Sequence, residues 1–466
     1  MGKVTVESMC EKYEEFLIDE SKYGGGAQSI SFPETETEVC EILRQMAQER
    51  VPVTIQGGKT GITGGAVPGG GHILNLSRMN RVLDTRKRED GICVVTVEPG
   101  VTLLDLEKAV LKAFGREKVF WPVQPTEKSA TVGGIAATGA QGPNEYAYGD
   151  SSQYILEVRM ACADGSVVTL TGDSLREVLG REGIAGVFTA LTLRLAEKPE
   201  DLWGICFFFS SEDQLSAFAD FFNEKKWEAD QARLTVAEYL DRETVKRIQE
   251  RKQDMAKIRE LPDVDEAFEG MVYLEIEGSS DGIEELAEEL MELAAEHGSD
   301  PDEAWALSGE TEVEKLRAFR HAAAESVNLN VEANRKGEAK ITKLATDFLW
   351  KQPSFSQVLE GYRKDLADSG IEHVIFGHIK GSHLHVNLLP KTEAEFEQGS
   401  QILRIWGEKC KAAGGVLTGE HGVGKLKRPL LEGLLPEADL ALCARLKETY
   451  DPSKLLNQGD ISDWEE

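Results

Sequence analysis

The sequence lacks the features that mark several common classes of protein. Its seven cysteines are scattered, and no two form a Cys-x-x-Cys pair, which excludes a zinc ribbon or an iron–sulfur cluster held by this chain alone. No stretch reaches the roughly 18 apolar residues of a membrane span. The N-terminal residues MGKVTVESMCEKYEEF are charged and lack the apolar core of a signal peptide. We therefore expect a cytoplasmic protein with no transmembrane segment, in a reducing compartment.

Positive charge is scarce as well. The chain has 52 Lys and Arg against 82 Asp and Glu, a net charge of −30 at pH 7. This balance disfavours nucleic acid and anionic membranes as partners, and simple solubility accounts for it. An anionic small substrate would need a local basic pocket. The length of 466 residues, 41% of them hydrophobic, allows two to three globular domains.

Glycine, in contrast, is concentrated in two blocks. The first, QGGKTGITGGAVPGGG at 56–71, contains a GGKT that is similar to the end of an ATP phosphate loop. That motif requires a glycine where Val53 stands, and a helix after it, so we exclude ATP. Bare N–H groups in glycine turns still favour a phosphate-bearing ligand.

The second block is VFWPVQPTEKSATVGGIAATGAQGPNEYAYGD at 119–150. Its small residues around Gly133 and Gly134 let the backbone approach a flat or extended ligand closely. Glycine runs of this kind also occur in plain tight turns, but two blocks flanked by predicted strands favour a ligand.

The apolar pattern predicts an α+β protein. Up to about residue 197, β-rich runs alternate with glycine-rich turns and with amphipathic helices at 36–50 and 103–115. After Lys198-Pro199 the chain contains little glycine and predicts an α+β plate that covers another part of the molecule. Its expected strands lie at 203–211 and 271–278, and its expected helices at 212–226, 243–260 and 282–297. We place the domains at 1–198, 199–408 and 409–466.

Three of the eight histidines fall within FGHIKGSHLHVNLLP, at 376–390. The alternation of HLHVNLLP puts His383, His385 and Asn387 on one face of a strand. VIFGH before it predicts the partner strand of a hairpin, with His378 and His385 diagonally placed and within reach of one metal. Structural histidines are the alternative. Further on, GGVLTGEHGVGKLKRP places Glu420 and His421 between glycines, a pattern that a simple turn would also produce.

With these motifs the chain resembles the FAD-linked oxidase family, which has the vanillyl-alcohol oxidase type of flavin fold. Within it, the chain is similar to the D-2-hydroxyacid dehydrogenases for D-lactate, glycolate and D-2-hydroxyglutarate. The resemblance runs from FPETETEV at Phe32 to LLNQGD at Asp460. It implies an FAD-binding domain, a substrate (cap) domain, and a C-terminal segment that completes the active site and the FAD site. The implied reaction is metal-assisted oxidation of a D-2-hydroxyacid to the 2-oxoacid, with hydride transfer to FAD.

The resemblance assigns the FAD contacts to four segments. The first glycine loop would cradle the pyrophosphate and the second block would lie along the flavin and its ribityl chain, with further contacts from REGIAGVFT and near the C-terminus. The residues are Gln56, Gly57, Gly58, Lys59, Thr60, Gly61, Thr63, Gly64 and Gly65, then Pro125, Thr126, Thr131, Gly133, Gly134, Thr138 and Gly139, then Glu182, Gly183, Gly186 and Val187, and finally Asn457. Neither glycine block contains the His or Cys that binds flavin covalently in some relatives, so we expect noncovalent FAD. The family commonly has Gly in place of Lys59, whose cation would pair with phosphate or point to solvent.

The same resemblance assigns the chemistry. His378, His385 and Glu420 would bind a divalent metal, and two His with one Glu suit Zn, Mn or Fe. His421 would take the proton of the substrate hydroxyl. Arg320 would bind the substrate carboxylate, with Arg317 as the alternative one turn earlier, and Lys343 and Asn387 would add substrate contacts. An acidic residue that the family has between the two histidines is absent, and Lys380 is gained.

Two other classes of function stay open. One is a flavin enzyme of the same fold that needs no metal, such as an alcohol oxidase or an ether-lipid synthase. The other is a flavin-carrying electron-transfer subunit with structural histidines. The electron acceptor is open too: an electron-transfer flavoprotein, an iron–sulfur protein, a quinone or oxygen. The particular 2-hydroxyacid is not readable from the sequence.

Overall fold

The computed structural model describes residues 5–115, 118–338 and 340–463, which divide into two compact units. The first unit takes in the described residues of Met1–Gly142, Asp150–Lys198 and Glu420–Glu466, and the second Pro143–Gly149 and Pro199–Gly419. The chain thus leaves the first unit at Lys198 and returns to it at Glu420, whereas the sequence placed the return near residue 409.

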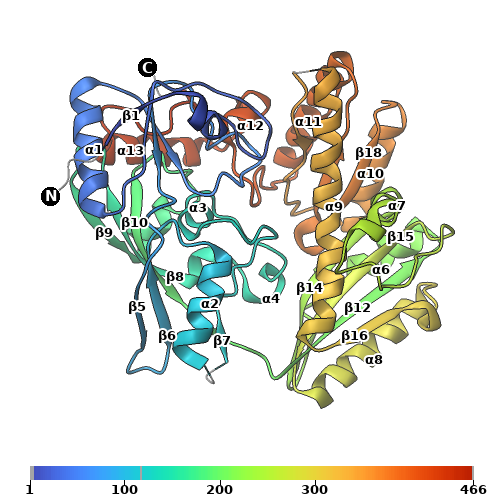
Figure 1. Ribbon diagram of the computed structural model, residues 1–466. Coiled ribbons are helices and arrows are strands. Elements are labelled where there is room, and N and C mark those ends of the chain that lie inside the picture. Colours follow the sequence, from blue (N-terminus) through green and yellow to red (C-terminus); the bar gives the residue numbers. More distant parts are fainter. Residues whose placement is uncertain (1–4, 116–117, 339, 464–466) are drawn as a thin grey trace. The chain divides into compact units, whose positions relative to one another are not determined.

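Two sheets form the frame of the first unit (Figure 1). A four-stranded sheet has the order β1-β2-β4-β3, in which β4 runs parallel to both β2 and β3. A five-stranded antiparallel sheet has the order β5-β6-β10-β8-β9. The strands are β1 (Glu7–Ser8), β2 (Ser29–Ser31), β3 (Val53–Gln56), β4 (His72–Asn75), β5 (Val82–Lys87), β6 (Cys93–Val97), β8 (Ile155–Ala161), β9 (Val167–Thr171) and β10 (Val187–Arg194), with β7 (Val119–Phe120) and β11 (Ala196–Glu197) as a separate pair.

Two helices of the first unit begin at threonine caps. Thr35 and Thr102 accept the backbone N–H of Glu38 at 3.2 Å and of Asp105 at 3.1 Å. The helices predicted at 36–50 and 103–115 are found as α1 (Glu36–Glu49) and α2 (Leu103–Phe114). The other helical segments are η1 (Glu11–Leu17), α3 (Val132–Thr138), η3 (Ser151–Tyr154), α5 (Gly172–Val178), α12 (Gly424–Leu431) and α13 (Glu437–Tyr450).

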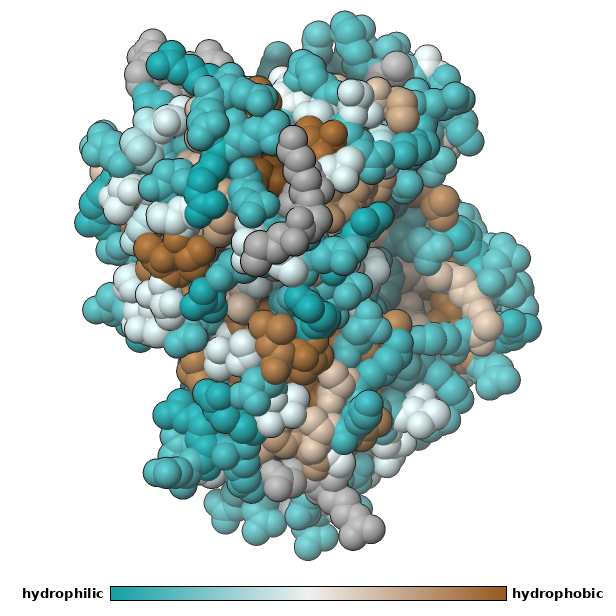
Figure 2. All heavy atoms as spheres, turned by 60° about the vertical axis from the view of Figure 1, so that its left-hand side comes forward, coloured by the Kyte–Doolittle hydropathy of each residue, from teal (hydrophilic) through white to brown (hydrophobic). Residues whose placement is uncertain are grey.

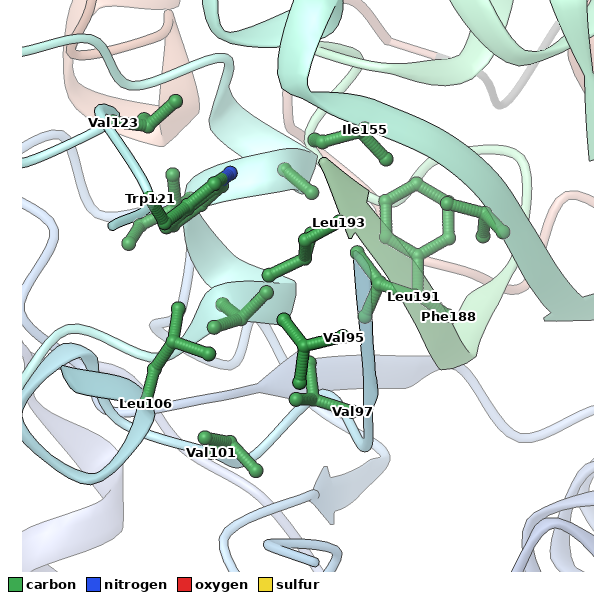
Figure 3. Packing of buried hydrophobic residues seen from close by; sticks show 14 of the residues in the cluster. Val95, Val97, Val101, Leu106, Trp121, Val123, Ile155, Phe188, Leu191 and Leu193 are labelled. Atoms are coloured by element: carbon green, nitrogen blue, oxygen red, sulfur yellow. The ribbon is translucent and has the colours of Figure 1, made fainter. Parts of the chain in front are cut away.

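One hydrophobic core holds the second glycine block in place. Figure 3 shows Val95 and Val97 of β6 with Leu191 and Leu193 of β10 and Leu106 of α2. Val132 and Ile135 of α3 belong to the same core. The alternation of the strands and the helical spacing bring these side chains to a common face. The position of α3 is therefore fixed by buried apolar contacts on the side away from its glycines.

The second unit is built on an eight-stranded antiparallel sheet with the order β16-β12-β15-β14-β18-β19-β17, and β13 pairs with β14. The strands are β12 (Asp201–Phe209), β13 (Glu228–Ala229), β14 (Ala232–Asp241), β15 (Gly270–Gly278), β16 (Trp305–Ser308), β17 (Leu344–Ala345), β18 (His373–His378) and β19 (His383–Leu388). The sequence analysis did not predict β14, because Glu238 interrupts its apolar pattern.

Helices cover both faces of this sheet. Phe207 of β12 faces α6 (Glu212–Glu224), where its ring lies 5.6 Å from that of Phe218. Phe208, on the opposite face, belongs to a core that includes Phe319 of α9 (Glu310–Gly337). The other helical segments are α4 (Glu145–Tyr148), α7 (Arg242–Arg251), η4 (Lys252–Asp254), α8 (Ser280–Glu296), η5 (Pro301–Glu303), α10 (Phe355–Ala367), η6 (Lys380–Ser382) and α11 (Glu393–Ala412).

The helix predicted at 243–260 ends early, at Arg251. The buried ammonium of Lys252 donates to the carbonyl of Pro262 at 2.9 Å and to Asp263 at 2.6 Å, and these bonds hold a turn where the sequence predicted more helix.

Among the described residues, no helix combines the length and the apolar character needed to cross a membrane. On the face seen in Figure 2, hydrophilic side chains predominate and apolar ones lie in small separate groups. This surface agrees with the large share of charged residues in the sequence.

Candidate active site

The first glycine loop follows β3 in the first unit. Gln56 is buried, and its amide donates to the carbonyls of Phe16 at 2.8 Å and of Ala66 at 2.7 Å. A Cβ on Gly57 would lie 2.3 Å from Oγ1 of Thr131, so a side chain cannot be accommodated there. The two glycine blocks therefore pack against each other, and their bare backbone fits a ligand that carries phosphates.

Most of the residues predicted in the second block begin, end or pack the short helix α3. Thr131 caps the helix by accepting the N–H of Gly134 at 3.3 Å. A Cβ on Gly133 would lie 2.5 Å from Pro99, and Gly139 ends the helix with φ 69°. The Thr138 hydroxyl donates to the Gly134 carbonyl at 3.0 Å. Pro125 and Thr126 lie in the irregular segment before α3.

The side chain of Lys59 binds the protein itself. Its ammonium donates to the carbonyl of Glu15 at 2.6 Å and lies 4.3 Å from the centre of the Phe16 ring. The sequence analysis expected phosphate or solvent as its partner. In the structure this cation instead links η1 to the glycine loop, so its side chain is engaged within the protein.

Asn457 and Glu182 tie the loop to the C-terminal segment. Asn457 Oδ1 accepts the N–H of Ile55 at 2.8 Å, and its Nδ2 donates to the carbonyl of Glu182 at 2.6 Å. The Glu182 carboxylate accepts the N–H groups of Val423 at 2.6 Å and Gly424 at 2.8 Å. Burial raises the pKa of Glu182, and these two N–H groups act against that rise. Glu182 thus shapes the glycine-rich turn after His421.

The other residues predicted in the segment 182–187 are explained by backbone conformation, close packing and the start of a strand. Gly183 has φ 69°, which an L side chain rarely adopts. A Cβ on Gly186 would lie 2.6 Å from Cγ of Met160. Val187 is the first residue of β10.

The loop that carries His421 rests on the first glycine loop. The Thr63 hydroxyl donates to the carbonyl of His421 at 3.2 Å, and Leu426 N–H donates to the carbonyl of Thr63 at 3.0 Å. Beside them, Lys425 pairs with the buried Asp460 at 2.8 Å, although burial raises the pKa of Asp460 to about 8. The residue predicted as the base is therefore anchored directly to the predicted phosphate loop. The neighbouring loop positions Thr60, Gly61, Gly64 and Gly65 complete the turn.

The three clustered histidines lie together in the second unit. In the β18–β19 hairpin, His378 is opposite His383 and Phe376 is opposite His385. His378 and His385 are therefore diagonal neighbours, with ring centroids 5.6 Å apart, and His383 lies 4.8 Å from His385. The hairpin that the sequence predicted thus brings all three rings to one place.

Each ring is oriented by an oxygen acceptor. Nδ1 of His378 is bonded to the carboxylate of Glu238, and Nδ1 of His385 to the carbonyl of Thr346 at 3.4 Å. With Nδ1–H donated in this way, the lone pair of a neutral ring is on Nε2, the nitrogen that would bind a metal. His383 differs, because its Nε2 is bonded to Asp347 at 2.9 Å.

Glu238 on β14 links the histidines to α9. Its carboxylate, in a side chain 1% exposed, also accepts from Nε of Arg320 at 2.6 Å. Burial would raise the pKa of Glu238, but the charge of Arg320 and the hydrogen bonds from Arg320 and His378 outweigh burial and hold it at about 2. Arg320 is 5% exposed, and its guanidinium lies 4.8 Å from the centre of the Phe376 ring.

Arg317, one turn earlier on α9, has a different partner. Its guanidinium forms a bidentate pair with Glu275 on β15, which also accepts from Tyr273. Of the two candidate arginines, Arg320 is the one that shares a carboxylate with a predicted metal ligand.

The remaining predicted substrate contacts lie near the hairpin. Lys343 donates to Asn328 of α9 at 3.0 Å. Asn387 is buried on β19, and its amide donates to the carbonyl of His385 at 3.0 Å. Asn387 therefore supports the strand that carries His385.

Two carboxylates beside the histidines, Glu238 and Asp347, were not predicted from the sequence. Asp347, His383 and His385 offer ligand atoms within 4.8 Å of one another, a second group that could hold a metal ion. Glu420 begins the segment that returns to the first unit. The residue before it, Gly419, donates its N–H to the Asp347 carbonyl at 2.8 Å, and a Cβ there would lie 2.6 Å from His383. The chain thus passes the histidines immediately before Glu420.

Comparison with solved structures defines the fold. The chain is similar to 4-ethylphenol oxidase from Gulosibacter chungangensis, with 17% identity, a TM-score of 0.73, and coverage of 98% of this chain and 94% of the other. It is also similar to p-cresol methylhydroxylase, with 14% identity, a TM-score of 0.74, and coverage of 99% and 94%. Both likenesses concern the fold, which is the vanillyl-alcohol oxidase type that the sequence predicted.

Sequence matches then give the family. Residues 27–171 match the FAD binding domain, and residues 205–461 match the C-terminal domain of FAD linked oxidases. The chain therefore belongs to the FAD-linked oxidase family and is an FAD-dependent oxidoreductase, as predicted.

Named relatives cover almost the whole chain. The D-lactate dehydrogenase of Anaerostipes hadrus is 28% identical over 96% of this chain and 92% of its own length. The glycolate oxidase subunit GlcD of Bacillus subtilis is 26% identical over 94% and 90%. The D-2-hydroxyglutarate dehydrogenase of Xanthomonas citri is 24% identical over 93% and 89%.

Proposed function

We propose that the protein oxidises a D-2-hydroxyacid, D-lactate or a close analogue, to the 2-oxoacid, with noncovalent FAD and a divalent metal. The single observation that carries this proposal is the link from Arg320 through Glu238 to His378. It couples a cation suited to a carboxylate with an imidazole suited to a metal. The names of the relatives support the same substrate class.

The chain's own residues would bind and orient the substrate. Arg320 would hold the substrate carboxylate through charge-assisted hydrogen bonds, which fixes the face that the α-carbon presents. His421 would accept the proton of the hydroxyl, since a neutral imidazole can do so near pH 7. Only Glu420 separates His421 from Gly419, whose N–H donates to the carbonyl of Asp347.

Two bound groups would supply the rest of the chemistry. When bound, FAD would supply the acceptor for the hydride of the α-carbon, and a divalent metal would lower the pKa of the substrate hydroxyl. His378, His385 and Glu420 would hold that metal, with Zn, Mn and Fe as candidates. The bonds at Nδ1 of both histidines support this set, because they fix the tautomer that ligation requires.

The electrons would pass to a separate acceptor. An electron-transfer flavoprotein or an iron–sulfur protein is our proposal for the partner, since no Cys-x-x-Cys is present for a cluster of the chain's own. A reducing, cytoplasmic setting suits the seven cysteines, all of which lie among the described residues as free thiols.

A substrate panel tests the proposed function. Metal-loaded enzyme would be assayed with D- and L-lactate, glycolate and D-2-hydroxyglutarate, with a dye as the electron acceptor. We expect turnover with at least one 2-hydroxyacid and a preference for D over L enantiomers. Turnover of simple alcohols alone, unaffected by a chelator, would instead indicate a metal-independent flavin oxidase of the same fold.

A further inference from the structure

One carboxylate contacts both parts of the proposed substrate site. Oε2 of Glu238 accepts from Nε of Arg320 at 2.6 Å, and Oε1 is bonded to Nδ1 of His378. Glu238 and His378 are directly opposite in the register of β14 and β18. Both strands are interior to the eight-stranded sheet, so this link is built on rigid elements.

We propose that Glu238 is a positioning residue that sets the spacing and orientation of Arg320 relative to His378, and so selects substrates whose carboxylate and hydroxyl are on adjacent carbons. This inference rests on the proposed function and names the residue behind its selectivity for 2-hydroxyacids.

The contacts of Arg320 support this role. Nε of Arg320 donates to Glu238, and the guanidinium carbon of Arg320 lies 4.8 Å from the centre of the Phe376 ring. A guanidinium held at Nε and on one face has a fixed plane, and its terminal Nη pair is the edge that meets a carboxylate bidentately. Glu238 therefore orients the clamp as well as balancing its charge.

The bond to His378 fixes the other end. A carboxylate on the distal nitrogen of a metal-binding histidine sets its tautomer and ring orientation. Because one side chain holds both groups, a change in Glu238 displaces them together. A 3-hydroxyacid, with one more carbon between its two groups, would not match a spacing fixed in this way.

Glu238→Gln is the decisive substitution. Glutamine has the same shape, but only one of its terminal atoms accepts hydrogen bonds, so it cannot serve the two donors Arg320 and His378 at once. Glu275→Gln is the matched control, since Glu275 is also buried, lies on the neighbouring strand β15, and pairs with an arginine of α9.

Two readouts would be taken on FAD-loaded, metal-stripped protein. Calorimetry with Zn²⁺ or Mn²⁺ gives the metal affinity without any turnover, and we expect Glu238→Gln to weaken it about 10- to 100-fold. Kinetics at saturating metal should show KM for D-lactate raised about tenfold or more with kcat changed much less, and a smaller preference for D-lactate over D-3-hydroxybutyrate. Glu275→Gln should leave metal affinity and this preference at wild-type values.

The outcomes separate this inference from the proposed function. If the wild-type protein does not turn over any D-2-hydroxyacid, the proposed function is wrong. If the wild type turns over and Glu238→Gln changes metal affinity alone, KM alone, or neither, the role of Glu238 is overturned. Should Glu238→Gln fail to retain FAD, Glu238→Asp serves as the second variant. Asp keeps the charge but is too short to span both partners, so the same paired loss is expected and its absence is equally decisive.

Discussion

At the scale of single residues, Arg320 is the side chain that we propose to bind the substrate carboxylate. Its removal would leave Glu238 buried without its cation, at a cost of about 3–5 kcal/mol in folding free energy, so Arg320→Lys is a cleaner change than Arg320→Ala. Lysine keeps the charge but loses the planar fork, and we predict that KM for D-hydroxyacids rises roughly 10- to 100-fold. Steady-state kinetics measures this.

Arg317→Lys is the control for that change. It breaks the bidentate pair with Glu275, one turn away on the same helix. We expect KM to stay near the wild-type value. The reverse result, with KM raised by Arg317→Lys and unchanged by Arg320→Lys, would move the clamp one turn along α9.

His421 and the metal ligands should respond differently to substitution. His421→Ala should keep FAD and metal but reduce the rate of flavin reduction by roughly 10²–10⁴-fold, because a positioned base contributes about that much. His378→Ala and His385→Ala should lower metal content and activity together, with partial rescue by added metal. Elemental analysis and stopped-flow absorbance measure the two effects.

His383→Ala tests the competing ligand set. Because Nε2 of His383 is bonded to Asp347, we expect this variant to keep its metal and part of its turnover. If it loses the metal while His378→Ala keeps it, the group of Asp347, His383 and His385 is the metal site instead.

The sequence predicts residues of this site where a short-range pattern exists. Alternation in HLHVNLLP is enough to place His383 and His385 on one face, and the hairpin places His378 diagonally to His385. Glu238 and Asp347 have no such pattern. Each becomes a partner of a histidine only through pairing that is distant in the sequence, 140 residues away for Glu238 and His378.

At the scale of elements, Asn457 joins segments that are far apart in the chain. It bonds to β3 and to the Glu182 turn, which in turn holds the loop after His421. Asn457→Ala removes two hydrogen bonds from a buried site, and we predict a loss of roughly 1–3 kcal/mol in folding free energy together with weaker FAD retention.

Thermal unfolding and released flavin fluorescence measure these two effects. Gln458→Ala is the control, because the Gln458 amide makes a local bond, to the Lys454 carbonyl at 2.8 Å. A stability and FAD affinity equal to those of the wild type in Asn457→Ala would show that this junction does not support the cofactor loop.

Element prediction succeeds where apolar periodicity and caps agree. The helices α1 and α2 were predicted within a residue from their amphipathic pattern, and the structure shows that threonine caps begin both. It fails where burial overrides local pattern, as in β14, whose Glu238 is charged yet buried. In the second glycine block, the sequence indicates a close backbone approach but does not reveal the short helix α3, which the core contacts of Val132 and Ile135 stabilise.

At the scale of the whole molecule, the chain consists of two units, and the glycine content of the sequence differs between them. The shift in glycine content after Lys198 coincides with a passage of the chain between the units, because the glycine-rich loops belong to the first unit and the second consists of strands and helices with fewer such loops. The return at Glu420 has no comparable shift, since glycine-rich sequence begins before it and continues after it. The identity of the metal stays a prediction, because two histidines and a carboxylate suit several metals. The electron acceptor stays a prediction as well.

The central claim is that the metal site and the flavin act on the same 2-hydroxyacid. Anaerobic absorbance of the FAD-loaded protein tests it most directly, with D-lactate and D-2-hydroxyglutarate added before and after treatment with a chelator. The account predicts that at least one of them bleaches the flavin in metal-loaded protein, that chelation slows bleaching strongly, and that Zn²⁺ or Mn²⁺ restores it. Bleaching that chelation leaves unchanged, or no bleaching by either acid in metal-loaded protein, would contradict the account.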